Sequence, residues 1–457
     1  MKIKTISRTE EDYCRKTKHD ITKVHRNRDP ALHPFEKERE YTRALSAVKL
    51  DKIFAKPFVG ALDGHNDSIC SMSTVRNKVV PLISGSCDGE LKVWDLTRRV
   101  CFWSAAAHAG FVRGIAPDEG GNSFYTCGDD KMIKQWSLLA DKSSSSSSSS
   151  SSQVEPINAI VAPHALKAID HHWIDRQYAT VGESVCVWDG TRSSSDPIHS
   201  YSWGNDSLMS VKYNPAEASL LLATAADRSI LLYDLRVSIP MRKCVLPMKS
   251  NKAVWNPLEP FNFVVANEDH NLYSFDMRNL SQALMIHKDH VSAVMDVAIS
   301  PTGKECVSGG YDNTVRIFPL SGANVGRSRE MYHSKRMQHV FSVAYSSDAT
   351  FVLSGSDDTN IRIWKSNASK SLGIAAGREE RKLKYLDTVK KRYQHLPEIK
   401  RIINDKHVPK RIKKANEIQH IQHASERRKL SNRIEHSREG SIVTQPERAR
   451  AVIKEFK

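Results

Sequence analysis

The 457-residue sequence predicts an all-β protein: a seven-bladed β-propeller with an N-terminal arm and helix and a basic α-helical C-terminal tail. Three observations predict this fold, namely a repeat of nearly constant length, a fixed order of residues within it, and short strand-like runs between turn residues. Six copies place an aspartate six residues before an aromatic residue: Asp88/Trp94, Asp130/Trp136, Asp227/Tyr233, Asp269/Phe275, Asp312/Phe318 and Asp358/Trp364.

The spacing of these closing aromatic residues sets the period of the repeat. A seventh copy ends at Trp188 and has Gly182 in the aspartate position, and successive aromatics lie 42, 52, 45, 42, 43 and 46 residues apart. The long interval contains the serine run 143–152, and without it that interval is also 42 residues. A period of about 40–45 residues with this internal order is typical of WD40 repeats, each of which forms one four-stranded blade.

The repeated polar residues have a structural interpretation. In WD40 repeats a histidine, the turn aspartate and the closing tryptophan form a hydrogen-bonded set, and His65, Asp88 and Trp94 match it. A buried polar group without a partner costs roughly 1–3 kcal/mol, so such residues need one another. We therefore expect a structural role, rather than catalysis or metal binding, for these three and for the equivalent residues Asp130, Trp136, Asp227, Asp269, Asp312, Asp358 and Trp364.

The last repeat ends at Trp364, which leaves the seventh blade without its outermost strand. Residues 58–62 read as a strand before the first repeat, and we expect them to pair with blade seven and close the ring, which removes exposed sheet edges. The expected organisation is an arm and helix over 1–57, a propeller over 58–365 with a loop insertion at 141–154, and a helical extension over 366–457. The serine run is a flexible linker or a phosphorylated loop.

Several classes of protein do not fit the sequence. No run approaches the ~18 apolar residues of a membrane helix, and the N-terminus lacks the apolar segment of a signal peptide. The eight cysteines include no C-x-x-C pair, so no zinc module is expected. There is no glycine-rich phosphate loop and no nucleophile elbow. We expect no enzyme, no catalytic residue, no metal, no cofactor and no membrane partner.

Charge is distributed unevenly along the chain. Residues 1–57 carry a net charge of +6 and residues 366–457 carry +13, whereas the propeller range carries −3. Clustered lysines and arginines release condensed counterions from nucleic acid, so both flanks favour a polyanionic partner.

Helical periodicity marks both flanks. In 34–52, Phe35, Tyr41, Leu45 and Val48 recur at helical spacing after Pro34, and we expect this helix to pack on the outside of the propeller. In the tail, helices are expected at 379–393, 398–403 and 412–433, too polar to form a core of their own.

The densest charge in the chain lies on these tail helices. Few aromatic residues lie among the basic ones, which favours contact with phosphates over base stacking. The alternative is a solvated helical face or a nuclear-import signal. The candidate RNA or ribonucleoprotein contacts are Lys390, Lys391, Arg392, Lys410, Arg411, Lys413, Lys414, Arg427, Arg428 and Lys429.

Six segments carry a resemblance to a known family: RDPALHPF at 28–35, REYTRAL at 39–45, FAKPFV at 54–59, HAGFVRG at 108–114, IDHHW at 169–173 and NRIEHS at 432–437. Together they resemble the suppressor-of-fibrillarin WD40 proteins of ribosome biogenesis, also known as a cullin-4 ubiquitin-ligase-associated WD40 family. The resemblance implies a scaffold of the small-subunit processome, located in the nucleus and nucleolus. Its implied partners are processome proteins, pre-rRNA and the U3 small nucleolar RNA, and its implied role is 18S rRNA maturation and 40S assembly.

A second role comes with the animal members of the family. WD40 receptors of the cullin-4 ligase carry an aromatic-Asp-x-Arg sequence at the ends of two neighbouring blades, where the arginines contact the ligase adaptor. Two such sequences occur in consecutive repeats, with candidate residues Asp234, Arg236, Asp276 and Arg278. They have Tyr and Phe where Trp is usual. The alternative is that each Asp-x-Arg only ties its own turn.

Overall fold

The computed structural model describes residues 18, 30–138, 155–192, 196–203, 206–237, 239–322, 326–438, 441–442 and 444–456. Apart from residue 18, the expected N-terminal arm lies outside the described residues, as does the serine run 143–152. The chain divides into two compact units. A helical unit comprises Met1–Pro57 and Asn367–Lys406, and a propeller unit comprises Phe58–Ser366 and His407–Lys457. The tail expected as one extension over 366–457 is thus shared between the two units.

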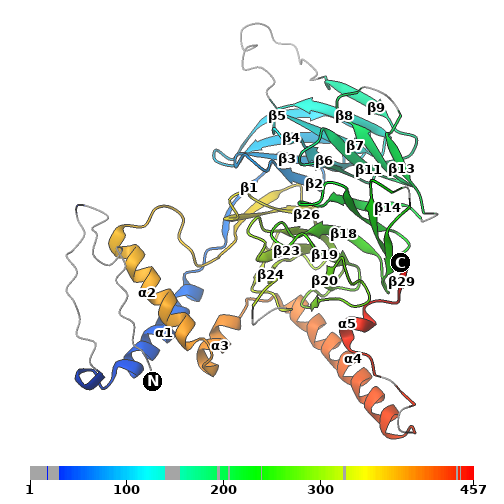
Figure 1. The fold of residues 1–457 in the computed structure, drawn as a ribbon. Coiled ribbons are helices and arrows are strands. Elements are labelled where there is room, and N and C mark those ends of the chain that lie inside the picture. The colour runs from blue at the N-terminus through cyan, green and yellow to red at the C-terminus, as the bar shows by residue number, and fades with distance from the viewer. Residues whose placement is uncertain are drawn as a thin grey trace, which may run out of the picture. The chain divides into compact units, whose positions relative to one another are not determined.

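The propeller unit contains the seven sheets that the repeat predicts (Figure 1). Blade one contains β2 (Ile69–Thr74), β3 (Pro81–Ser86), β4 (Glu90–Asp95) and β5 (Val100–Ala106). Blade two contains β6 (Val112–Pro117), β7 (Ser123–Gly128), β8 (Met132–Ser137) and β9 (Asn158–Val161). Blade three contains β10 (Ala168–His171), β11 (Gln177–Val181), β12 (Val185–Asp189) and β13 (His199–Tyr201).

The remaining blades follow the same antiparallel order. Blade four contains β14 (Leu208–Tyr213), β15 (Leu220–Ala225), β16 (Ser229–Asp234) and β17 (Arg242–Val245). Blade five contains β18 (Ser250–Trp255), β19 (Asn262–Asn267), β20 (Leu272–Asp276) and β21 (Met285–His287). Blade six contains β22 (Val294–Ile299), β23 (Glu305–Gly310), β24 (Val315–Pro319) and β25 (Glu330–Tyr332). Blade seven contains β26 (Val340–Tyr345), β27 (Phe351–Ser356) and β28 (Ile361–Lys365).

The ring closes through the strand that precedes the first repeat. Strand β1 (Phe58–Leu62) pairs antiparallel with β28, with Phe58 opposite Trp364 and Leu62 opposite Ile361. The Phe58 and Trp364 rings also meet edge to face, with their centroids 5.5 Å apart. The predicted closure of blade seven is confirmed, and it hides the outer edge of β28.

The apolar core lies between neighbouring blades. One buried cluster joins blades four and five through Leu222, Phe263 and Phe275, and comparable clusters join blades one and two, two and three, three and four, five and six, and seven and one. Between blades six and seven, β26 packs on β22 and β23. Each sheet therefore buries both faces against adjacent sheets, which explains why its central strands read as nearly continuous apolar runs.

The six repeated aspartates share one local role, which the sequence did not indicate. Each is followed by a residue with a left-handed backbone, such as Lys131 at φ 65° and Asn313 at φ 60°. A carboxylate oxygen accepts the backbone N–H two residues further on, at 3.1 Å for both Asp130 and Asp312. This bond gives a partner to a backbone N–H in the tight turn between the second and third strands. It also offsets the conformational free energy that the left-handed residue costs.

The expected set of His65, Asp88 and Trp94 is wrong in one member. His65 Nε2 and Trp94 Nε1 both meet the hydroxyl of Ser84, at 2.7 and 2.8 Å, whereas Asp88 bonds within its own turn to Ser86 and to the N–H of Glu90. The hydroxyl on the second strand is the missing partner, because it accepts from the tryptophan and bonds the histidine at once.

Blade two contains the complete set. His108 bonds Asp130 through Nδ1 at 2.9 Å and Thr126 Oγ1 through Nε2 at 2.9 Å, and Trp136 Nε1 donates to the same Oγ1 at 3.0 Å. Burial lowers the pKa of His108, partly opposed by Asp130. In blade two the turn aspartate therefore also bonds the buried histidine, whereas in blade one it bonds only within its own turn.

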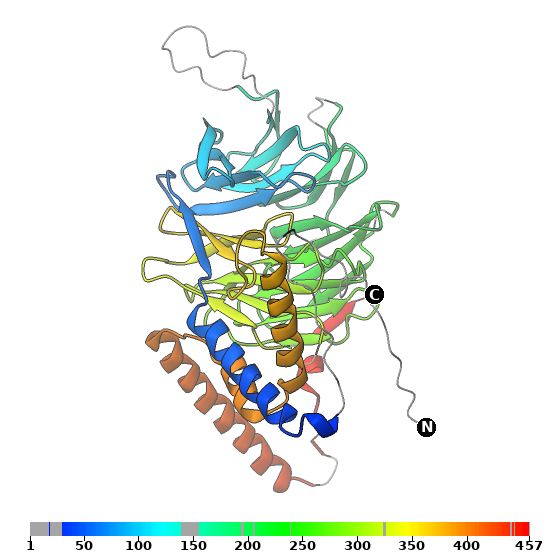
Figure 2. The ribbon, with the colours of Figure 1, turned by 90° about the vertical axis from the view of Figure 1, so that its left-hand side faces the viewer.

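The described part of the helical unit contains three α-helices, which follow a 3-10 turn at Pro30–Leu32. They are α1 (Glu36–Ile53), α2 (Gly377–Tyr393) and α3 (Pro397–Asn404), and they lie side by side in Figures 1 and 2. Their core contains the buried Ala44, Val48, Val389 and Ile399. Helices α2 and α3 each bury a single apolar side chain here, so they share this core with α1 and do not form one of their own, as expected. The apolar face of α1, expected on the propeller, packs into this core instead.

The rest of the tail belongs to the propeller unit. Helix α4 (Lys410–Glu435) and the short helix α5 (Glu447–Arg450) lead to β29 (Lys454–Phe456), which pairs with β17 as the fifth strand of blade four. Ala451 is buried in the apolar cluster between blades four and five. The chain end therefore covers the outer edge of blade four by strand addition.

Thr126→Val tests the hydroxyl of blade two. We expect a loss of roughly 1–3 kcal/mol in the free energy of unfolding, because the substitution leaves the buried His108 and Trp136 nitrogens without a partner. The measurement is denaturant unfolding followed by circular dichroism. Thr224→Val is the matched control, because Thr224 is equally buried and its hydroxyl has no hydrogen-bond partner. Equal losses for both variants would contradict the role of this hydroxyl.

Candidate functional site

An exposed basic cluster lies at the start of α4. Lys410, Arg411, Lys413 and Lys414, which we call the tail cluster, surround the single buried residue of this helix, Ile412. All four side chains are exposed and, within the described part of the chain, none forms an ion pair. Four unneutralised cations within five residues make this the strongest candidate for a polyanion contact.

The cluster at 390–392 is partly used inside the helical unit. Lys390 lies 2.6 Å from an Asp51 oxygen and 2.7 Å from an Asp387 oxygen. Arg392 lies 2.7 Å from a Glu40 oxygen. Burial opposes ionisation of Lys390, but hydrogen bonds with Asp387 and Asp51 raise its pKa overall. Only Lys391 of the three candidates is left exposed without an ion pair among the described residues.

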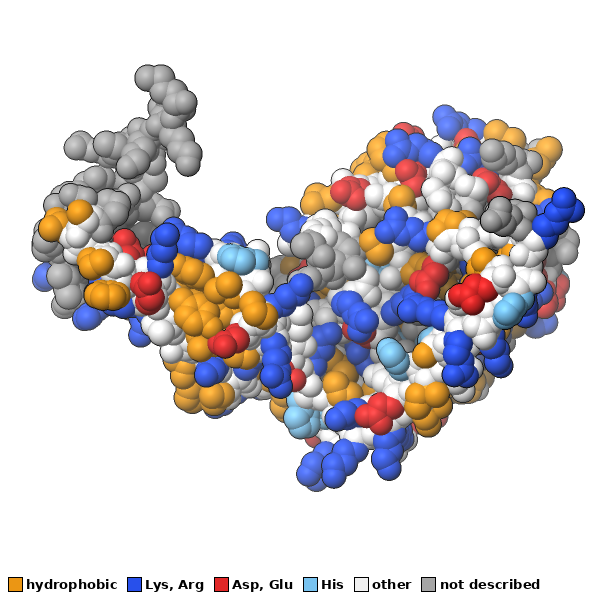
Figure 3. Space-filling view, turned by 90° about the horizontal axis from the view of Figure 1, so that it is seen from below, with side chains coloured by type: hydrophobic (Ala, Val, Ile, Leu, Met, Phe, Trp, Pro, Cys, Tyr) orange, Lys and Arg blue, Asp and Glu red, His pale blue; other side chains and the backbone are white. Residues whose placement is uncertain are grey.

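The third cluster lies near the end of α4. Arg427 pairs with Glu447 of α5 at 3.6 Å, and the side chains of Arg427, Arg428 and Lys429 are all exposed. In Figure 3, Lys and Arg side chains, in blue, border a hollow in the face of the propeller unit that is turned to the viewer.

Sequence reasoning missed other cations near that third cluster. Lys288, Arg327, Arg433 and Arg450 line the same cavity as Arg427. They come from blade five, blade six, α4 and α5, so no local sequence signal marks them as a group.

The two Asp-x-Arg sequences adopt the same geometry. In blade four, Arg236 donates from Nε and Nη2 to the two oxygens of Asp234, at 3.1 and 3.0 Å. In blade five, Arg278 makes the same pair of bonds to Asp276, at 3.1 and 2.9 Å. Each bidentate bond lowers the pKa of its aspartate. Both arginines therefore tie their own turns, as the alternative interpretation states.

The same arginines are also open to a partner. The side chain of Arg236 is 72% exposed and that of Arg278 is 65% exposed. Arg278 additionally lies over the Phe261 ring, 4.7 Å from its centroid. Held in fixed positions by their aspartates, two similar guanidinium groups on consecutive blades form a repeated, partly unsatisfied donor surface.

The pair His171 and His172 connects parts of the ring. Both side chains are buried. His172 Nε2 lies 3.2 Å from the Ala218 carbonyl oxygen of blade four, and His171 Nε2 lies 3.4 Å from an Asp118 oxygen of blade two. These contacts fit packing between neighbouring blades.

Two further features are absent from the part of the chain that the structure describes. Within the described residues, no group of three or more His, Cys, Asp or Glu side chains has the arrangement of a metal site. Among the described helices, none combines the length and the apolar character that a membrane span needs.

Two family models match this chain, one in the propeller and one in the tail. The WD domain, G-beta repeat, matches residues 56–95, 99–137, 281–318 and 332–365. The Sof1-like domain matches residues 366–452. The crystal structure of the WD40 beta propeller domain of Doa1 is similar in fold, with a TM-score of 0.56 at 19% identity, over 68% of this chain and 96% of that one.

Full-length relatives are much more similar. The chain is 47% identical to DDB1- and CUL4-associated factor 13 of Danio rerio over 454 residues, and 47% identical to the protein of that name in Homo sapiens over 453 residues, in each case over 99% of both chains. It is 44% identical to Protein SOF1 of Saccharomyces cerevisiae over 92% of this chain and 88% of that protein. The chain therefore belongs to the suppressor-of-fibrillarin, or Sof1-like, family of WD40 ribosome-biogenesis proteins, which includes the DDB1- and CUL4-associated factor 13 proteins.

Proposed function

We propose that this protein is a non-enzymatic scaffold of the small-subunit processome, which acts in the nucleolus in pre-rRNA processing towards 18S rRNA and in 40S assembly with the U3 small nucleolar ribonucleoprotein. The observation that carries the proposal is the tail cluster. Lys410, Arg411, Lys413 and Lys414 project from one turn of a helix attached to a large ring, and none has an acidic partner in the described part of the chain.

The ring and the tail differ in charge, and this difference supports the proposed role. The ring offers several blade ends to proteins, and its net charge is close to zero. The tail cluster offers cations that displace counterions from an RNA backbone without reading its bases. Family membership and the name of Protein SOF1 agree with a role in ribosome assembly.

Replacing the four residues of the tail cluster by Glu tests RNA binding. We expect at least a tenfold loss of affinity for U3 small nucleolar RNA, and a decrease of about 3 in the slope of log affinity against log salt concentration, since four phosphate contacts are lost. The measurement is fluorescence polarisation at several salt concentrations. In cells, we expect the variant to leave the nucleolar precursor particles.

The control for this variant is matched in charge. Arg76, Lys304, Lys335 and Arg336 are exposed propeller residues without ion pairs among the described residues, and their replacement by Glu changes the net charge equally. If both variants lose affinity alike, the effect is one of net charge and not of the tail cluster. Charge reversal is preferable to deletion of the tail, because deletion also removes α2, α3 and β29 from packed positions.

The second candidate function is that of a substrate receptor of a cullin-4 ubiquitin ligase. The specific observation is the equal geometry and exposure of Arg236 and Arg278 on consecutive blades. The printed name of the vertebrate relatives, DDB1- and CUL4-associated factor 13, agrees with it. The two functions are compatible because the arginines and the tail cluster lie on different parts of the propeller unit.

Arg236→Ala combined with Arg278→Ala tests this receptor function. We expect at least a tenfold loss of affinity for the ligase's propeller adaptor, as measured by pull-down and biolayer interferometry. Nucleolar localisation in cells is expected to be unchanged. Arg98 and Arg192 are matched controls, since both are exposed blade-end arginines paired with an aspartate three residues earlier. Full adaptor binding by the Arg236/Arg278 variant would show that these arginines only stabilise their own turns.

A further inference from the structure

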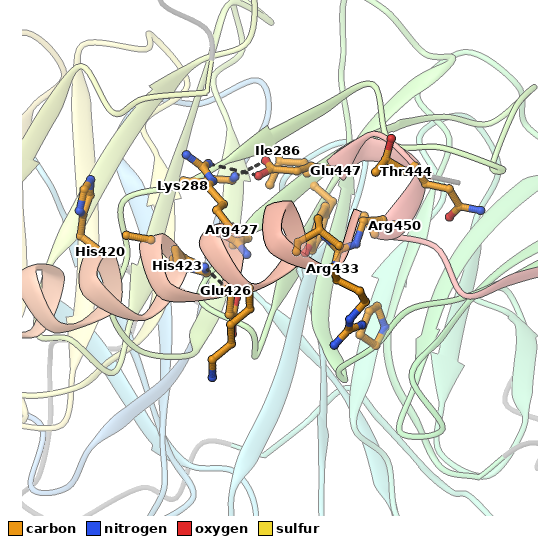
Figure 4. A pocket seen from close by; sticks show the side chains of 18 of the residues that line it. Ile286, Lys288, His420, His423, Glu426, Arg427, Arg433, Thr444, Glu447 and Arg450 are labelled. Atoms are coloured by element: carbon orange, nitrogen blue, oxygen red, sulfur yellow. Dashed lines mark hydrogen bonds and ion pairs between the residues drawn. The ribbon is translucent and has the colours of Figure 1, made fainter. Parts of the chain in front are cut away.

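A large cleft separates α4 from the propeller blades. It has a volume of about 1140 Å³ and lies between the second half of α4, α5, the outer strand of blade five and loops of blades four and six. Ligand pockets for small molecules measure about 300–1,000 Å³, so this cleft is large enough for a segment of polypeptide or nucleic acid. Figure 4 shows side chains from both walls pointing into it.

Positive charge converges on this cleft. Six cations line it, against two carboxylates, Glu426 and Glu447, and two histidines are also present. Like charges that face one another across a cleft are unfavourable unless an anion lies between them. The six cations are Lys288, Arg327, Arg427, Lys429, Arg433 and Arg450.

The carboxylates already present do not neutralise the cleft. Glu447 is shared by Lys288 at 2.5 Å and Arg427 at 3.6 Å, as the dashed lines of Figure 4 mark. A hydrogen bond and the charge of Lys288 lower the pKa of Glu447. Lys429, Arg433 and Arg450 have no acidic partner among the residues that the structure describes. Glu447 thus shows how the cleft holds a carboxylate, and three cations remain available for others.

The floor of the cleft is aliphatic. Ile286 and Leu430 are half-buried, and Ile286 packs against the apolar cluster between blades four and five, in which Ala451 is buried. Tyr273 also lines the cleft but is only 4% exposed, so it offers no free ring for a base to stack on. An RNA backbone gains little from an aliphatic floor, whereas a peptide gains by placing apolar side chains on it.

We propose that this cleft binds an acidic peptide segment of a partner protein, with apolar side chains seated on Ile286 and Leu430 and carboxylates paired with Arg433 and Arg450. The charge complementarity requires Asp or Glu, and the floor requires Leu, Ile, Val or Phe, within the same short segment. The cleft lies in the second half of α4, whereas the tail cluster occupies its first turn, so this proposal does not depend on RNA binding.

The test is selection of a random 12-residue peptide library, displayed on phage, against the full-length protein. We expect the selected sequences to combine acidic and apolar residues. Their affinities are then measured by fluorescence polarisation with synthetic labelled peptides, beside a labelled 12-nucleotide single-stranded RNA.

Two variants and one control locate the binding. Arg433→Glu with Arg450→Gln is expected to weaken the selected peptides at least tenfold, and Leu430→Gln at least fivefold. Arg76→Glu with Lys304→Gln gives the same change in net charge at exposed propeller residues that do not line the cleft, and is expected to leave peptide affinity within twofold. Unchanged circular dichroism and melting temperatures confirm that the variants are folded.

Three outcomes would overturn the proposal. One is selection of peptides without acidic residues. Another is equal loss of affinity in the Arg433/Arg450 variant and its control. The third is a loss of RNA affinity in the Arg433/Arg450 variant while its affinity for the selected peptides is unchanged. That result would assign the cleft to nucleic acid. Failure of the tail-cluster variant to lose RNA would bear only on the proposed function, since it changes no cleft residue.

Discussion

The bond between each turn aspartate and the N–H two residues later is the interaction on which the ring depends. It holds one residue per turn in the left-handed region, as at Arg228 and His270, where non-glycine residues are uncommon. This tight turn directs the third strand of each blade back along the second. Blade three lacks the aspartate and uses Gly182 for a different reason, because a Cβ there would lie 2.5 Å from the Ala165 carbonyl oxygen.

Binding surfaces in this protein are built by attaching the tail to that ring at separate points. Strand β29 is fixed to β17, and Ala451 is buried between two blades, so the short helix before them has a defined position. Helix α4, in contrast, buries only Ile412 and exposes most of its surface. A helix of this kind gains little stability from its own sequence, and it contacts the rest of the unit through Ile412, a hydrogen bond from Gln419 to the Val291 carbonyl oxygen and the ion pair of Arg427 with Glu447. Its exposed cations are therefore presented by the ring without being neutralised by it.

Local patterns in the sequence were sufficient for the propeller. The 42-residue period, the strand runs and the missing outer strand of blade seven identified seven blades and their closure. The helices of the tail were also recognised, since hydrophobic periodicity is a local property. Partners across the fold were harder to identify. The hydroxyl of Ser84 was missed beside His65, because serines are frequent and nothing in the spacing distinguishes a buried one.

The period of the repeat and the distribution of charge can be read in the sequence alone, and they predicted the fold class and a basic tail, whereas six short segments carried the resemblance to the family. The tertiary structure alone decided which cations remain available, and the reason is that ion pairs form between residues far apart in the chain. Lys390 meets Asp51 across 339 positions, whereas the tail cluster meets no carboxylate among the described residues. Equally, Lys288 and Arg433 belong to one cleft only because the chain end returns to blade four, and no local pattern records that return.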